Sequence, residues 1–142
     1  MRQLLSELSN RLQLKLLHCD MFPYKHKYTI DMGLGESNAL NVAYGISKFE
    51  PVLIYGVCGF LLHRFEPLLH NLRFAEHPVL LFNAGGSNNP CYSNFGWGHT
   101  CFEDIKLAEI LKIPVYTPKY EDFEETCLKL LQLGGLKLIR LT

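Results

Sequence analysis

The chain has 142 residues, enough for one domain that buries about two-thirds of the surface exposed by its unfolded form. Hydrophobic residues make up 48% of the sequence and charged residues 20%, which argues against an intrinsically disordered chain. Fourteen Lys and Arg balance fourteen Asp and Glu without a basic cluster, so nucleic acids and anionic membranes are not expected partners. We therefore expect a single domain over residues 1–142.

The apolar periodicity predicts alternating helices and strands along the chain. The predicted helices cover 4–12, 36–48, 60–74, 101–112 and 120–132, and the predicted strands cover 27–32, 52–55, 79–82, 114–117 and 136–141. The helix over 60–74 is expected to tolerate Pro67. No strand is predicted before the one at 27–32, so the opening of the sheet looks short. The alternation predicts an α/β domain, doubly wound, with a mostly parallel sheet flanked by helices in three layers.

The cysteines and histidines are not spaced as metal ligands usually are. The five cysteines are scattered and odd in number without a C-x-x-C pair, and the six histidines form no recognisable zinc motif. This pattern favours free thiols in a reducing compartment and predicts a cytoplasmic protein without a metal site of its own. Polar residues interrupt the N-terminal leucines, so neither a signal peptide nor a membrane span is expected there.

The segments that leave the strands at their carboxyl ends are where a ligand is expected, because open α/β sheets bind ligands there. The longest of these segments, 83–100, is rich in Gly, Asn and Ser. A loop of that length inside a compact domain is usually functional. The other segments are 33–37, 56–59 and 117–120.

The first of these segments reads GLGES and leads into a predicted helix that carries Glu36 in its first turn. One interpretation of Glu36 is an acid stabilised by the helix dipole, worth about 0.3–1 kcal/mol. The segment lacks the third glycine of a dinucleotide-binding motif, so a dinucleotide-binding site is not supported here. Glu36 is therefore either a structural first-turn acid or a functional carboxylate.

Aromatic residues follow the second segment. Phe60 and Phe65 lie near the start of a predicted helix, either as core aromatics or as a wall on which a flat heterocycle stacks. His63 and Arg64 are interpreted as surface residues.

A histidine follows the long loop. His99 precedes a predicted helix, either as a loop histidine satisfied by the backbone or as a group that reaches a ligand. Thr100 and Glu103 have the spacing of a capping box, which gives Glu103 a structural role.

Taken in order, these segments resemble the pyrimidine-binding (Pyr) domain of transketolase-like thiamine diphosphate enzymes. GLGESN at 33–38 resembles that family's G-I-A-E-Q-N helix entry, within a similar stretch over 30–46. GWGHTCFED at 96–104 resembles its G-x-T-H-H-x-x-E-D turn, within a similar stretch over 79–118. The likeness covers about residues 28–130 and implies the thiamine diphosphate-binding fold.

The resemblance implies roles for the candidate residues. A glutamate placed like Glu36 hydrogen-bonds N1′ of the cofactor's aminopyrimidine, favouring the tautomer that removes the thiazolium C2 proton. Phe60 and Phe65 would stack on the aminopyrimidine, and His99 would face substrate and cofactor. Glu36 and His99 are therefore the expected catalytic residues, and the expected cofactor-binding residues are Glu36, Phe60 and Phe65.

The sequence departs from the family pattern in ways that affect which partner chain we expect. The G-D-G and downstream N-N signature for diphosphate and Mg²⁺ is absent, and Thr100 stands where the family often has a second histidine. We therefore expect a separate pyrophosphate-binding chain that holds thiamine diphosphate with Mg²⁺, homo-association, and a sugar or 2-oxo-acid substrate. The expected function is a Pyr subunit of a split transferase of the transketolase type. The alternatives are a non-catalytic interaction or regulatory protein on the same domain, and a flavodoxin-like binding domain.

Overall fold

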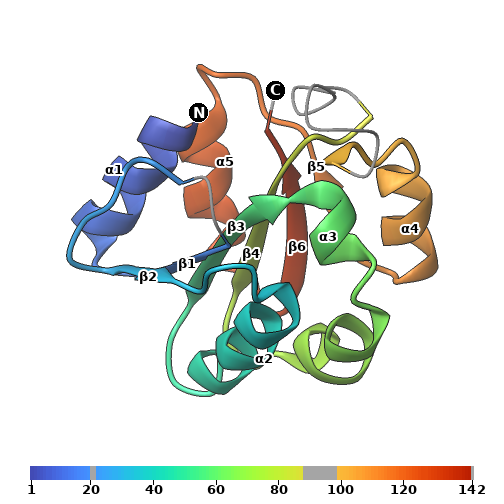
Figure 1. The fold of residues 1–142 in the computed structure, drawn as a ribbon. Helices are drawn as coiled ribbons and strands as arrows, with labels where there is room; N and C mark the ends of the chain where they lie inside the picture. Colours follow the sequence, from blue (N-terminus) through green and yellow to red (C-terminus); the bar gives the residue numbers. More distant parts are fainter. Residues whose placement is uncertain (20–21, 88–98, 142) are drawn as a thin grey trace.

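The fold is a parallel sheet between two layers of helices (Figure 1). The computed structural model describes residues 1–19, 22–87 and 99–141. Its six-stranded sheet has the order β2-β1-β3-β4-β6-β5, and all five strand pairings are parallel. The strands are β1 Lys15–His18, β2 Thr29–Asp31, β3 Val52–Val57, β4 Val79–Ala84, β5 Val115–Tyr116 and β6 Leu136–Arg140. The predicted α/β class with a parallel sheet is confirmed.

Alternating side chains of the buried strands pack into two separate hydrophobic cores, one on each face of the sheet. Val52 and Ile54 of β3 pack on one face of the sheet, whereas Leu53 and Tyr55 pack on the other. Each fully buried aliphatic or aromatic side chain of this kind stabilises the fold by about 1.5–3 kcal/mol. Apolar runs such as Val52–Val57 are typical of strands covered on both faces.

The helices divide between the two faces (Figure 1). Residues of α1 and α5 join the core on one face, and residues of α2, α3, α4 and the helical turns η1 and η2 join the core on the other. The helical elements are α1 Arg2–Leu12, α2 Glu36–Ile46, α3 Cys58–Leu62, η1 Pro67–Asn71, η2 Leu72–Phe74, α4 Asp104–Ile110 and α5 Phe123–Leu130. Within the described ranges, none of them has the length and hydropathy that a membrane crossing requires.

Strand β1 corrects the sequence-based expectation that no strand precedes residue 27. Gln13 adopts a left-handed conformation at φ 57° and ends α1, and β1 begins two residues later. Leucines occur in α1, in the connection and in β1, so no composition change marks the boundary. β1 lies between β2 and β3 and delivers His18 and Cys19 to the carboxyl edge of the sheet.

The single helix predicted over 60–74 is also wrong. Helix α3 ends at Leu62, and Pro67 begins the separate π-helical turn η1. Proline is tolerated in the first turn of a helical element, where its missing N–H would have no partner anyway. In a helix interior it removes a hydrogen bond and clashes with the preceding turn, so Pro67 marks a break.

Helix α5 packs on the sheet through Phe123, Cys127 and Leu130. Burial raises the pKa of the Cys127 thiol from 9.0 to about 12, with a smaller contribution from the negative charge of Glu124. Between pH 9 and about 12 the unfolded thiol has lost its proton while the folded one keeps it. The folded state then binds more protons, so the free energy of unfolding falls as pH rises through this window.

Replacing Cys127 by alanine removes this proton linkage. We expect the free energy of unfolding of the variant to fall less steeply with pH than that of the wild type, by up to about 1.4 kcal/mol per pH unit. Urea denaturation at intervals between pH 8 and pH 11 measures both slopes, while the other alkaline groups are shared by the two proteins. Parallel pH profiles would contradict the assignment.

Candidate functional site

The carboxyl edge of the sheet gathers the candidate residues. Strand β1 ends in His18 and continues into Cys19, and β2 ends at Asp31. Strand β3 leads directly into α3, which carries Phe60. Because all the strands are parallel, these ends lie at one edge.

Glu36 is the first residue of α2 and is only 8% exposed. It follows a tight turn in which Gly33 has φ 59° and donates its N–H to Asp31 Oδ1 at 3.0 Å. A Cβ atom on Gly35 would lie 2.8 Å from the carbonyl oxygen of Met32, so this turn excludes a side chain at Gly35. The two glycines therefore allow the compact entry that places the carboxylate at the edge of the sheet.

The Glu36 carboxylate is not neutralised by a basic side chain within the described ranges, where none of the ion pairs includes it. Cys19 lies close enough to sense its charge. Burial, then the charges of Glu36 and Asp31, raise the pKa of the Cys19 thiol to about 12. The first-turn location agrees with the helix-dipole interpretation, and the burial adds a property that an exposed first-turn acid does not have.

Phe60 and His99 form an aromatic pair. Their ring centroids are 5.0 Å apart with an interplanar angle of 72°, an edge-to-face arrangement. Both residues are partly exposed. Two segments almost forty residues apart in the sequence are thus brought together at the sheet edge.

Phe65 lies apart from α3, in the connection before η1, and is 42% exposed. His63 and Arg64 in the same connection are exposed, in agreement with their interpretation as surface residues. The cofactor-stacking role of Phe65 therefore has less structural support than that of Phe60. Residues 88–98, which include the first three residues of the GWGHTCFED motif, lie outside the described residues.

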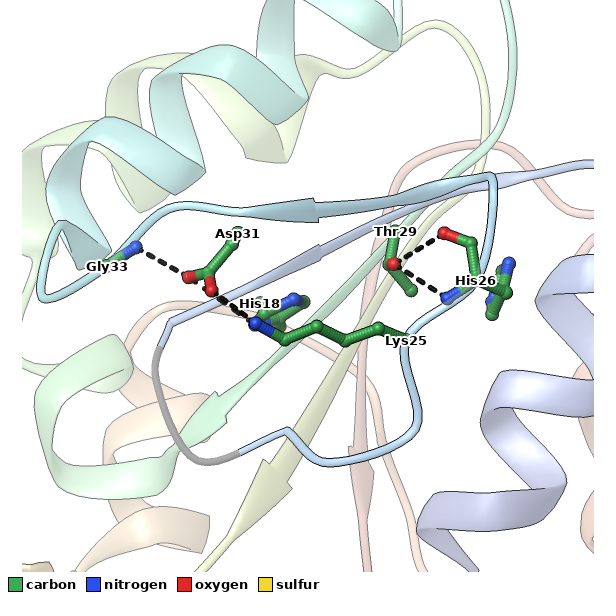
Figure 2. A network of polar contacts seen from close by, with 6 residues as sticks. All are labelled: His18, Lys25, His26, Thr29, Asp31 and Gly33. Atoms are coloured by element: carbon green, nitrogen blue, oxygen red, sulfur yellow. Dashed lines mark hydrogen bonds and ion pairs between the residues drawn. The ribbon is translucent and has the colours of Figure 1, made fainter.

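A polar network missed by the sequence analysis lies at the ends of β1 and β2 (Figure 2). Figure 2 shows His18, Lys25 and Asp31 pointing toward one another, with Lys25 Nζ 2.8 Å from Asp31 Oδ2 and His18 Nδ1 3.8 Å from Asp31 Oδ1. The hydrogen bond from Lys25, followed by that from the Gly33 N–H, lowers the pKa of Asp31. Asp31 thus connects the segment before β2 with the turn that leads to Glu36.

A second missed network lies at the ends of β4 and β6, around a buried ion pair. Arg140 Nε donates to Asp104 Oδ2 at 2.7 Å, and the two side chains are 8% and 0% exposed. Ser87 Oγ donates to Asp104 Oδ1 at 2.7 Å and accepts a hydrogen bond from Arg140 Nη2 at 2.7 Å. Ser87 precedes residues 88–98 and Asp104 follows His99, so hydrogen bonds to one buried ion pair connect the described residues on both sides of that segment.

The capping box expected at Thr100 and Glu103 is wrong. Helix α4 begins at Asp104, its N-cap is Glu103, and no side-chain cap hydrogen bond is formed. Thr100 is instead buried at 8% exposure. Asp104 accepts the N–H of Ile105 at 3.0 Å as well as the bonds from Ser87 and Arg140, so the carboxylate at 104 organises this helix start.

Comparison with known proteins adds information about the fold. No family model matches the sequence, and no curated protein matches it. A solved structure described as "split gene transketolase, inactive beta4 tetramer" matches with a TM-score of 0.77 and 19% identity over 98% of this chain and 48% of that chain. A benzoylformate decarboxylase from Polynucleobacter necessarius matches with a TM-score of 0.71 and 16% identity over 99% of this chain and 29% of that chain.

This chain thus spans about half of the transketolase chain and under a third of the decarboxylase chain. At such low identities the likeness concerns the fold. Together with the parallel sheet, it confirms the resemblance found in the sequence: the chain has a pyrimidine-binding-domain-like fold of the thiamine diphosphate enzymes.

Proposed function

We propose that this chain is the pyrimidine-binding subunit of a split thiamine diphosphate-dependent enzyme of the transketolase type. In this proposal a separate chain supplies the pyrophosphate-binding domain, and the site forms between the two. The reaction is transfer of a two-carbon ketol unit between sugars, or a related 2-oxo-acid lyase or ligase step. The observation that carries the proposal is the buried Glu36 carboxylate at the carboxyl edge of a sheet with this fold.

The residues present fit the aminopyrimidine end of the cofactor. Glu36 is a buried acceptor without a basic partner in the described ranges, which suits a ring nitrogen that gains a proton. A charge-assisted hydrogen bond of this kind contributes about 1.5–3 kcal/mol. Phe60 offers a partly exposed ring for stacking, and His99 lies against it. When bound, the cofactor supplies the carbanion chemistry, while this chain orients and polarises its pyrimidine ring.

The diphosphate and its Mg²⁺ are assigned to the partner chain. The part of the chain that the structure describes contains no group of three or more His, Cys, Asp or Glu side chains that could hold a metal ion. The sequence also lacks the G-D-G and downstream N-N signature. The partner is therefore expected to be a chain that carries this signature.

Self-association of the isolated chain is part of the proposal. The similar transketolase chain is described as an inactive β4 tetramer, and this chain covers 48% of it. We expect this chain alone also to form a homo-oligomer without activity. Apolar surface that a partner normally covers drives such pairing.

Calorimetry tests the shared site. Thiamine diphosphate with Mg²⁺ is titrated into the full chain alone, into a candidate partner alone, and into the mixture. We expect negligible heat with this chain alone and saturable binding with the mixture, beyond what the partner shows alone. If the mixture forms a stable complex but does not bind the cofactor, the chain is a non-catalytic interaction protein and the proposed function is wrong.

A further inference from the structure

The turn between β2 and α2 has little hydrophobic packing of its own. Gly33 is exposed, and the side chain that follows it, Leu34, is 82% exposed. Among the described residues, no side chain caps the first turn of α2 with a hydrogen bond. Leu40 packs the middle of the helix into the core. Glu36, the first residue of the helix, therefore relies on the hydrogen bonds of the turn for its position.

Asp31 closes this turn through its side chain (Figure 2). Its Oδ1 accepts the N–H of Gly33 at 3.0 Å, and its Oδ2 accepts a hydrogen bond from Lys25 Nζ at 2.8 Å. Each carboxylate oxygen thus has a partner of its own. A bond from an aspartate to the backbone N–H two residues later is a common way to stabilise a tight turn, here one with Gly33 at φ 59°.

The backbone at Asp31 is fixed to the sheet. Asp31 is paired with His18 in the parallel ladder between β1 and β2, and the N–H of Met32 donates to the carbonyl oxygen of His18 at 2.8 Å. The carbonyl oxygen of Met32 is the atom against which Gly35 packs. A continuous series of contacts therefore runs from β1 through Asp31 and its turn to the residue before Glu36.

We propose that Asp31 is a positioning residue for Glu36, because its carboxylate closes the Gly33 turn and thereby holds the Glu36 carboxylate toward the aminopyrimidine. This inference rests on the proposed function of Glu36. The two acidic residues have different requirements: the role of Asp31 needs an oxygen that accepts the Gly33 N–H, whereas the role of Glu36 needs a negative charge. Small displacements matter at such a position, since about 1 Å can cost about 10²-fold in rate.

Amide exchange tests the turn without any cofactor. Asp31→Asn keeps an oxygen that can accept the Gly33 N–H, whereas Asp31→Ala removes that acceptor. Hydrogen–deuterium exchange of the full chain, resolved to single amides, compares both variants with the wild type. We expect the Gly33 amide to exchange up to about 10-fold faster in Asp31→Ala, the equivalent of one hydrogen bond, and near the wild-type rate in Asp31→Asn. The residues adjacent to this amide are the same in all three proteins, so its intrinsic rate is unchanged.

Exchange at C2 of thiamine diphosphate, bound to the complex with the partner chain, tests the effect on Glu36. At saturating cofactor we expect Asp31→Ala to lower this rate about 10-fold or more. Asp31→Asn should stay within about threefold of the wild type, because the turn is kept. Lys25→Met removes the ion pair with Asp31 but keeps the turn, so it should also retain C2 exchange.

Asp122→Ala is the matched control, because Asp122 is an exposed aspartate at the N-cap of α5 whose side chain forms no cap hydrogen bond within the described ranges. It should leave both measurements unchanged. The inference is wrong if Asp31→Ala matches the wild type in either measurement, or if Asp31→Asn is as impaired as Asp31→Ala. A Glu36→Gln complex that keeps the wild-type C2 rate would instead overturn the proposed function, while amide exchange would still decide whether Asp31 holds the turn.

Discussion

Replacing Glu36 by glutamine should lower turnover of the reconstituted enzyme by about 10²–10⁴-fold, the range typical of a lost acid–base contribution. Glutamine keeps the size of the side chain but removes the negative charge that favours a protonated pyrimidine nitrogen. Because no basic partner is left behind in the described ranges, the melting temperature should change little. Steady-state kinetics with saturating thiamine diphosphate and Mg²⁺ measures the loss.

Glu109→Gln is the matched control, since Glu109 is an exposed residue of α4 and the substitution removes the same charge. This variant should retain wild-type turnover. If Glu36→Gln turned over as fast as the wild type at equal cofactor occupancy, Glu36 would have no catalytic role, and the helix-dipole interpretation would account for it.

Replacing Asp104 by asparagine should lower the free energy of unfolding by about 3–5 kcal/mol, because it leaves the Arg140 guanidinium buried without its counter-charge. The Asp104 side chain is fully buried, and Arg140 is 8% exposed at a distance of 2.7 Å. Urea denaturation followed by circular dichroism measures the change. A loss below about 1 kcal/mol would mean that this pair behaves like a surface ion pair.

The exposed pair between Arg11 and Glu124 provides the comparison, because it has a similar N–O distance of 2.6 Å with side chains 55% and 51% exposed. Glu124→Gln should cost at most about 1 kcal/mol. In a double variant, Asp104→Asn with Arg140→Met, stability should partly return, because no unpaired charge remains buried. Failure of the second substitution to restore any stability would assign the loss to the hydrogen bonds of Asp104 with Ser87 and Ile105.

Most of the sheet could be predicted because its strands are buried on both faces. The apolar runs at 52–55 and 79–82 are short and bounded by turn-forming residues, which favours buried strands. In the structure they are part of the longer strands β3 and β4. Strand β1 was missed because leucines run from α1 into β1 and only the left-handed Gln13 separates them. The helix break at Pro67 could not be predicted, because a proline can lie either inside a kinked helix or at the start of a new helical turn. The tertiary structure decides between the two.

Some residues of the candidate site could likewise be predicted from the sequence, and others could not. Glu36, Phe60 and His99 could be singled out because each follows a strand end or a glycine-rich turn, and the structure brings the last two into contact. The Asp104–Arg140 pair could not be found by spacing, since its members are thirty-six residues apart. One signal was available: an arginine near the end of an otherwise apolar closing strand indicates a buried partner, because charged residues are rarely buried unless paired.

Scattered cysteines in a sequence without a C-x-x-C pair favour isolated free thiols. The described cysteines Cys19, Cys58, Cys101 and Cys127 are all free and buried, as expected for thiols in the reduced state.

The role of Glu36 is tested most directly by the rate of hydrogen–deuterium exchange at C2 of thiamine diphosphate bound to the complex of this chain with its partner. Exchange at C2 reports activation of the cofactor without requiring the substrate to be known. We expect exchange to be accelerated over the free cofactor in the wild-type complex and to return toward the free rate in Glu36→Gln. Equal acceleration in the two complexes, at equal cofactor occupancy, would contradict the claim that Glu36 activates the pyrimidine ring.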